Sequence, residues 1–179
     1  MPVRVLIAGY GYVGHQLAQV LKADHHEVIG IKRTQEPHAC DRMIIRDILN
    51  LQDHDLPEVD FVVYCPSSNH QDETAYQRIY AQGAKNLCNI YEKRSVKPRI
   101  LYTSSTRVYE QNHGQWVDED SPCAATDPLA QCILNGEEHI SSSTLDSMII
   151  RFSLLSFMIY SFYANRQALF LGIGRCLPI

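Results

Sequence analysis

The sequence lacks several features that mark common classes of protein. None of its six cysteines lies in a C-x-x-C pair, so no zinc site is predicted and the thiols are expected to be reduced. Lysine and arginine are scattered, and acidic residues outnumber them by 20 to 16, which argues against nucleic acid or an anionic membrane as a partner. No repeat of fixed period occurs, which excludes solenoids and propellers.

Targeting and membrane segments are also missing from the pattern. The apolar run near the N-terminus stops at glycines after the length of one strand, and no basic segment precedes it, unlike a secretory signal. The apolar stretch between Arg151 and Arg166 is too short for a membrane span of about 20 residues. We therefore expect a cytoplasmic protein.

The 179 residues, 45% of them hydrophobic, suffice for a domain with a hydrophobic core. Short apolar runs typical of buried strands alternate with segments of helical periodicity. Strands are predicted at residues 3–8, 28–31, 43–45, 61–65, 100–102 and 147–152, and helices after residue 12, at 73–91 and at 128–140. This alternation predicts a Rossmann-like, doubly wound parallel α/β sheet with helices on both faces and ligands beyond the carboxyl ends of its strands.

A glycine-rich segment joins the first predicted strand to the first predicted helix. It reads Gly9-Tyr10-Gly11-Tyr12-Val13-Gly14 and matches G-x-G-x-x-G. In this pattern the first glycine permits a tight turn, the second lets the backbone approach a pyrophosphate, and the third lets the helix pack on the sheet. A plain turn is the alternative, but the strand before and the helix after favour a dinucleotide site. The predicted cofactor residues here are Gly9, Gly11, Tyr12, Val13 and Gly14.

The end of the second strand distinguishes NAD from NADP. An acidic residue there would hold the ribose 2′-hydroxyl of NAD, whereas a basic one accepts the 2′-phosphate of NADP. The strand ends in Lys32, Arg33 and Thr34; Glu27 is at its other end and Glu36 lies beyond the basic pair. We predict that these three residues bind NADP, with NAD as the alternative cofactor and a solvated turn as the alternative structure.

Several stretches, in the same order, resemble the NAD-dependent epimerase/dehydratases, which are extended and atypical short-chain dehydrogenases. They are Gly9–Gly14, His26–Gly30, Asp47 after Ile44–Arg46, Asn86–Leu87, the S-S-x-x-V-Y-like Tyr102–Tyr109, and Trp116–Pro122. The resemblance covers residues 3–151 and implies an oxidoreductase or epimerase acting on a nucleotide sugar or another hydroxyl or carbonyl compound. It also implies that Asp47 contacts adenine. A homodimer is one possible oligomeric state of the chain. The end of the fourth strand adds Cys65, Pro66 and Ser67 to the expected cofactor residues.

The resemblance is incomplete where the family performs catalysis. It places Ser105 at the position of the serine that binds the substrate oxygen, although capping of local backbone groups is the alternative role. The family's Y-x-x-x-K proton relay is absent, because Leu129 and Ile133 occupy its two positions and no lysine follows Lys97. A tyrosine with its free pKa of about 10 needs such a cation to act near neutral pH.

The end of the chain has a different composition from the body. Four of the five phenylalanines follow residue 151, and no acidic residue follows Asp146. We therefore expect a dinucleotide-binding domain at residues 1–151 and a divergent or truncated apolar tail at 152–179, with the family's C-terminal substrate lobe missing. A frameshift or truncation is one hypothesis for this tail, and a natural helix over the sheet edge is the other. A non-catalytic NADP-binding regulator and an inactive fragment remain the alternatives to an enzyme.

Overall fold

The computed structural model describes residues 1–111, 115–123 and 126–153. Most of the expected tail, residues 152–179, therefore lies outside the described residues. Within them, the alternation of strands and helices predicted from the sequence is confirmed. The expected α/β class thus holds for the body of the chain.

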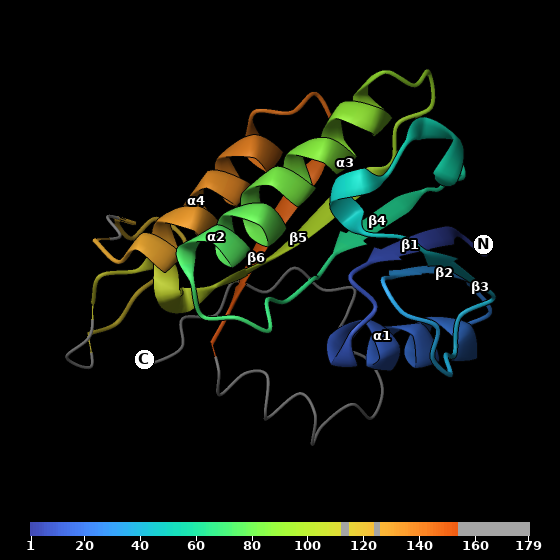
Figure 1. Ribbon diagram of the computed structural model, residues 1–179, viewed down its shortest axis with the longest axis horizontal. Coiled ribbons are helices and arrows are strands. Elements are labelled where there is room, and N and C mark those ends of the chain that lie inside the picture. The colour runs from blue at the N-terminus through green and yellow to red at the C-terminus, as the bar shows by residue number, and fades with distance from the viewer. Residues whose placement is uncertain (112–114, 124–125, 154–179) are drawn as a thin grey trace.

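The strands form one parallel sheet in the order β3-β2-β1-β4-β5-β6 (Figure 1). They are β1 (Arg4–Ala8), β2 (Glu27–Lys32), β3 (Arg42–Ile45), β4 (Phe61–Tyr64), β5 (Arg99–Ser105) and β6 (Ser147–Phe152). From β1 the chain winds outward to β2 and β3 on one side, then returns to β4 and winds the other way. The loops after β1 and β4 therefore diverge at the carboxyl ends of these two strands, which is the place where open parallel sheets generally bind ligands.

Helices cover both faces of the sheet, α1 on one and the remaining helices on the other (Figure 1). They are α1 (Tyr12–Ala23), α2 (Glu73–Tyr76), α3 (Gly83–Glu92) and α4 (Pro128–Ser141). Side chains of a strand point alternately to the two faces, so Leu6 packs in the core beneath α3, whereas Val5 and Ile7 pack in the core beneath α1. Each face of β1 is thus apolar, as a doubly covered strand requires.

The helix expected at residues 73–91 contains an irregularity that its periodicity does not predict. Residues Gln77–Gln82 form a π-helical segment between α2 and α3. Tyr64 and Tyr102, stacked on neighbouring strands, donate their hydroxyls to the carbonyls of Ile79 and Tyr80 in this segment. Burial raises the pKa of both phenols, so they stay protonated and act as donors. The inserted hydroxyls satisfy carbonyls in the widened turn.

Candidate functional site

Two glycines fix the turn at the carboxyl end of β1. Gly9 has φ of +100°, and a Cβ there would lie 2.3 Å from the backbone nitrogen of Pro66. Gly14 lies against β1, where an added Cβ would be 2.9 Å from Cγ2 of Ile7. Both positions therefore exclude a side chain, one by backbone conformation and close approach, the other by the packing of helix on strand.

Gly11 is different, because a Cβ added there would meet no atom of the described residues within 4 Å. Gly11 is the N-cap of α1, and its first turn contains no acidic residue. Within residues 1–111, 115–123 and 126–153, no side chain caps this helix end. The positive end of the helix dipole thus lies at the switch point of the sheet without a cap from the part of the chain that the structure describes. We call this uncapped helix end at Gly11 the Gly11 cradle. A pyrophosphate fits it, because backbone N–H groups can approach the phosphates without an intervening side chain. Tyr12 beside it is 55% exposed.

The residues that follow β4 contact the turn after β1. The Cys65 amide donates to the carbonyl of Ala8 at 2.8 Å, and its thiol lies 3.4 Å from the carbonyl oxygen of Gly9. Burial raises the pKa of Cys65 to about 12, so the thiol is neutral and packs as an apolar group. Pro66 is half-buried against Gly9, and Ser67 is exposed. Among the three residues predicted at this strand end, Ser67 is the one that solvent reaches most.

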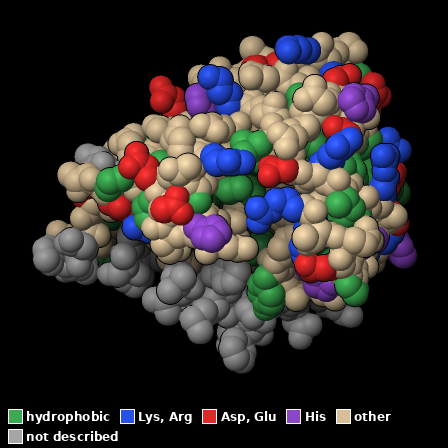
Figure 2. All heavy atoms as spheres, viewed as in Figure 1, with side chains coloured by type: hydrophobic (Ala, Val, Ile, Leu, Met, Phe, Trp, Pro, Cys, Tyr) green, Lys and Arg blue, Asp and Glu red, His purple; other side chains and the backbone are tan. Residues whose placement is uncertain are grey.

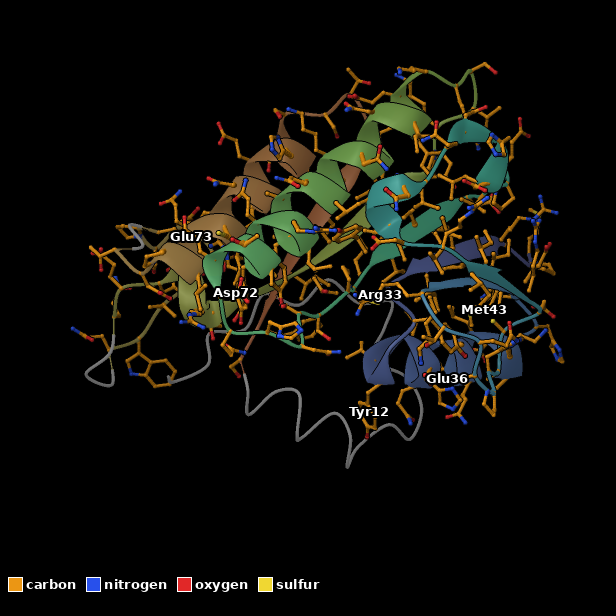
Figure 3. The ribbon with its side chains drawn as sticks, in the orientation of Figure 1. Tyr12, Arg33, Glu36, Met43, Asp72 and Glu73 are labelled. Carbon is orange, nitrogen blue, oxygen red and sulfur yellow. The ribbon has the colours of Figure 1, made fainter. Side chains whose placement is uncertain are left out.

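The basic segment after β2 is only partly available to a ligand. Lys32 forms an ion pair with Glu36, and the Thr34 hydroxyl donates to the same carboxylate at 3.0 Å. Arg33 is exposed, and no described residue forms a hydrogen bond or ion pair with its guanidinium. In Figure 3, Arg33 and Tyr12 lie near the N-terminal end of α1, and Glu36 lies farther along the helix. The sequence does not predict this pairing of Glu36, because a four-residue spacing indicates an ion pair within a helix and residues 33–36 follow a strand.

Asp47 lies just beyond the carboxyl end of β3. Its carboxylate accepts a hydrogen bond from the Leu49 amide at 3.0 Å and caps the short 3-10 helix Ile48–Asn50. Asn86 of α3 donates to the carbonyl of Ile48 at 3.0 Å. Hydrogen bonds within the turn and from Asn86 therefore fix this half-buried carboxylate just beyond the carboxyl end of β3.

The predicted catalytic serine has a local role in this structure. The Ser105 hydroxyl accepts from the Arg107 amide at 3.2 Å and caps a 3-10 turn after β5. Leu129 and Ile133 pack in an apolar cluster of buried residues around Tyr76 and Val108. The geometry therefore supports the capping role of Ser105, and the two relay positions of α4 are part of the packing.

A buried ion pair joins α4 to β6. Both carboxylate oxygens of Glu137 accept from the Arg151 guanidinium, at 2.9 and 2.7 Å, and Ser104 donates to the same carboxylate at 2.5 Å. Arg151 also donates to the Tyr109 hydroxyl at 2.9 Å. The hydrogen bond with Glu137 raises the pKa of Arg151. The only sign of this pair in the sequence is that opposite charges occur on an apolar helix face and in an apolar strand.

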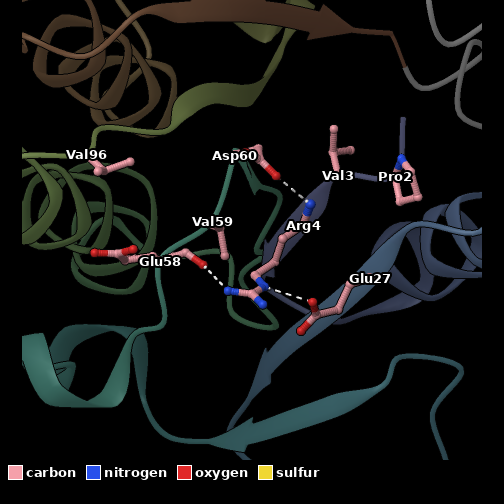
Figure 4. A pocket seen from close by; sticks show the side chains of 8 residues that line it. All are labelled: Pro2, Val3, Arg4, Glu27, Glu58, Val59, Asp60 and Val96. Carbon is pink, nitrogen blue, oxygen red and sulfur yellow. Dashed lines mark hydrogen bonds and ion pairs between the residues drawn. The ribbon is translucent and has the colours of Figure 1, made fainter.

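A cavity of about 340 Å³ lies at the other end of the strands, where their amino ends meet (Figure 4). Arg4 lies in it and pairs with Glu27 at 2.8 Å, donates to the carbonyl of Glu58 at 3.1 Å, and offers its amide to Asp60. This cavity is at the amino ends of the strands, and its lining pairs Arg4 with carboxylates. It therefore does not suit a phosphate.

The sequence profile of the NAD dependent epimerase/dehydratase family matches residues 5–156. The chain belongs to this family. A comparison with curated proteins gives no match. The resemblance seen in the order of the sequence motifs is thus confirmed.

Solved structures of epimerase/dehydratases and related proteins share the fold. A short-chain dehydrogenase/reductase superfamily protein from Agrobacterium tumefaciens with bound NAD matches with a TM-score of 0.69 and 21% identity, over 83% of this chain and 48% of that one. UDP-glucuronic acid 4-epimerase from Bacillus cereus in complex with NAD matches with a TM-score of 0.69 and 20% identity, over 84% of this chain and 56% of that one. A Methylobacillus flagellatus protein described as an NAD-dependent epimerase/dehydratase matches with a TM-score of 0.68 and 30% identity, over 85% of this chain and 54% of that one. The chain spans about half the length of these relatives.

Two surface properties of this epimerase/dehydratase family member bear on its partners. Basic and acidic side chains are interspersed over the face shown in Figure 2, without a field of one sign. In the part of the chain that the structure describes, no helix is both long and apolar enough to cross a bilayer.

Proposed function

We propose that this chain binds a nicotinamide dinucleotide across the carboxyl ends of β1, β2 and β4, with NADP preferred to NAD. The open cradle at Gly11 carries the proposal, because it joins an uncapped helix end to the switch point of the sheet. The solved relatives from Agrobacterium tumefaciens and Bacillus cereus contain NAD, which supports the cofactor class.

Each predicted residue has a place in this proposal. The Gly11 amide donates to the carbonyl of Gly9 at 2.8 Å, so the backbone of Gly11 would lie against the pyrophosphate while the amides of Tyr12 and Val13 approach it. Gly9 and Gly14 shape the turn, and Asp47 would contact the adenine side of the dinucleotide. The wall on the other side would be made by Cys65, Pro66 and Ser67.

The preference for NADP rests on Arg33. A guanidinium presents a planar set of donors that matches a phosphate, and that of Arg33 is exposed and has no partner among the described residues. A 2′-phosphate placed beside Arg33 would gain a charge-assisted interaction that the 2′-hydroxyl of NAD lacks. Arg33 therefore supplies the difference between the two cofactors.

When bound, a nicotinamide ring accepts or returns a hydride. We propose a hydroxyl or carbonyl compound as substrate, a nucleotide sugar in particular, because the Bacillus cereus relative is a UDP-glucuronic acid 4-epimerase. Ser105 is the hydroxyl of this chain that would hold the substrate oxygen. The proton would have to move through groups other than positions 129 and 133, since neither aliphatic side chain can carry one.

A second candidate function is binding of NADP without turnover, as in a sensor or regulator. The packing of Leu129 and Ile133 in an apolar cluster favours it, because the family's proton relay has no replacement at those positions. Reduction or epimerisation of a nucleotide sugar at a rate above that of the Ser105→Ala variant would favour the enzyme. Tight binding of NADPH with no such turnover would favour the regulator.

The substitution Arg33→Ala tests the cofactor preference. We expect it to weaken NADPH binding by about 10- to 100-fold, the equivalent of one lost charge-assisted contact, and to change NADH binding by less than about twofold. Arg42→Ala is the matched control, because Arg42 is also exposed but begins β3 at the opposite edge of the sheet. Isothermal titration calorimetry of both variants measures the affinities. Equal losses for the two nucleotides in Arg33→Ala would contradict the assignment.

A further inference from the structure

Glu36 occupies the donors next to Arg33. One carboxylate oxygen pairs with the Lys32 ammonium, and the other accepts the Thr34 hydroxyl at 3.0 Å. The hydrogen bond from Lys32, followed by that from Thr34, lowers the pKa of Glu36, so the carboxylate is charged at neutral pH. The carboxylate of Glu36 thus interacts with Lys32 and Thr34, two of the three residues that the sequence predicts to bind an anionic phosphate.

The position of this carboxylate matters because it is accessible rather than locked into the core. The side chain of Glu36 is 54% exposed and that of Lys32 is 27% exposed. An exposed ion pair of this kind contributes little to stability, so a competing anion can exchange with it at small cost. The pair is therefore better suited to tune the charge at the end of β2 than to hold the fold.

We propose that Glu36 is a specificity residue that opposes NADP by competing with the 2′-phosphate for Lys32 and Thr34. This inference rests on the proposed function, since it requires the adenosine ribose to lie at the end of β2. Arg33 attracts the 2′-phosphate, and Glu36 limits that attraction. The wild-type chain consequently has a narrower preference for NADP than its three residues Lys32, Arg33 and Thr34 alone would give.

The two cofactors meet Glu36 with different charges. The 2′-phosphate of NADP has to displace the carboxylate from its donors and then remain near it, so like charges repel at short range. The 2′-hydroxyl of NAD is neutral and can donate a hydrogen bond to the same carboxylate. Glu36 therefore weakens the binding of NADP, and it leaves the binding of NAD unchanged or slightly stronger.

The test is calorimetric titration of Glu36→Gln with NADPH and with NADH at one fixed ionic strength, because salt screens exposed charges. Glutamine keeps the size and an acceptor oxygen but removes the charge. We expect NADPH to bind about three- to fivefold more tightly than to the wild type, and NADH to bind equally or up to about twofold more weakly. Glu27→Gln is the matched control, since Glu27 also pairs with a cation and is 49% exposed but lies at the other end of β2. It should change neither affinity.

The outcomes separate the two proposals. An unchanged ratio of NADPH to NADH affinity in Glu36→Gln, with a wild type that binds both, would overturn the role of Glu36 and leave the dinucleotide site intact. Weaker NADPH binding in this variant would also overturn it, because Glu36 would then position Lys32 for the phosphate. A wild type that binds neither nucleotide would overturn the proposed function, and the role of Glu36 with it.

Discussion

Gly9 and Gly11, two residues apart in one turn, would respond in opposite ways to a side chain. Gly9 adopts a positive φ and approaches the Pro66 backbone, so a side chain there would strain the fold. Gly11 has an extended conformation, with φ of -94°, and the described residues leave room for a Cβ there. Its lack of a side chain serves no packing purpose in the described structure, which is the pattern expected where backbone approaches a ligand.

This contrast predicts the stability of two alanine variants. Gly9→Ala should lower the free energy of unfolding by about 3 kcal/mol or more, because positive φ and a backbone clash add. Gly11→Ala should change it by less than about 1 kcal/mol, since the weaker N-cap is offset by reduced freedom of the unfolded chain. Urea denaturation followed by circular dichroism measures both. A Gly11→Ala variant as unstable as Gly9→Ala would show that Gly11 is structural.

At the scale of elements, α4 and β6 are joined by the pair of Glu137 and Arg151. The side chains are 8% and 20% exposed, and Ser104 and Tyr109 complete their hydrogen bonds. Breaking a buried pair leaves a charge without its partner, which costs more than the pair contributes. This link anchors the last described strand to the helix that carries positions 129 and 133.

Glu137→Gln should therefore lower the free energy of unfolding by about 2–3 kcal/mol, because Arg151 keeps its charge without a carboxylate. Glu138→Gln is the control, since Glu138 is the next residue of α4 but is exposed, and its effect should stay within about 0.5 kcal/mol. Equal effects in the two variants, measured by urea denaturation, would argue against the ion pair as a link between α4 and β6.

The elements that the sequence predicts well are those whose signals are local. The glycine pattern predicts the turn between β1 and α1, and apolar runs predict the strands to within a few residues. The fifth strand is longer than residues 100–102, because Thr103, Ser104 and Ser105 continue the pairing with β6 although they are polar. Polar residues at the end of a buried strand give no periodic signal.

Other features depend on contacts between distant residues. The π-helical segment follows from two tyrosines on β4 and β5, which the periodicity of residues 73–91 cannot reveal. The pairing of Glu36 with Lys32 and that of Glu137 with Arg151 depend on where side chains meet after folding. The positions of the predicted residues at the strand ends follow from the local sequence pattern, whereas the ion pairs that these residues form do not.

At the scale of the whole molecule, the two edges of the sheet have different characters. At the carboxyl edge lie the Gly11 cradle, exposed Arg33 and the fixed Asp47, whereas at the amino edge the charge of Arg4 is matched by carboxylates. Parallel strands place all their carboxyl ends on one side, so turns far apart in sequence form one ligand-binding edge. This asymmetry supports a single dinucleotide crossing the sheet from β2 to β4.

Calorimetric titration of the unmodified chain with NADPH and NADH, with Gly11→Ala beside it, tests this account most directly. We predict saturable binding of both nucleotides at one site per chain, tighter for NADPH, and a loss of at least about tenfold in Gly11→Ala with its fold intact. No heat of binding with either nucleotide, or unchanged affinity in Gly11→Ala, would contradict the dinucleotide site.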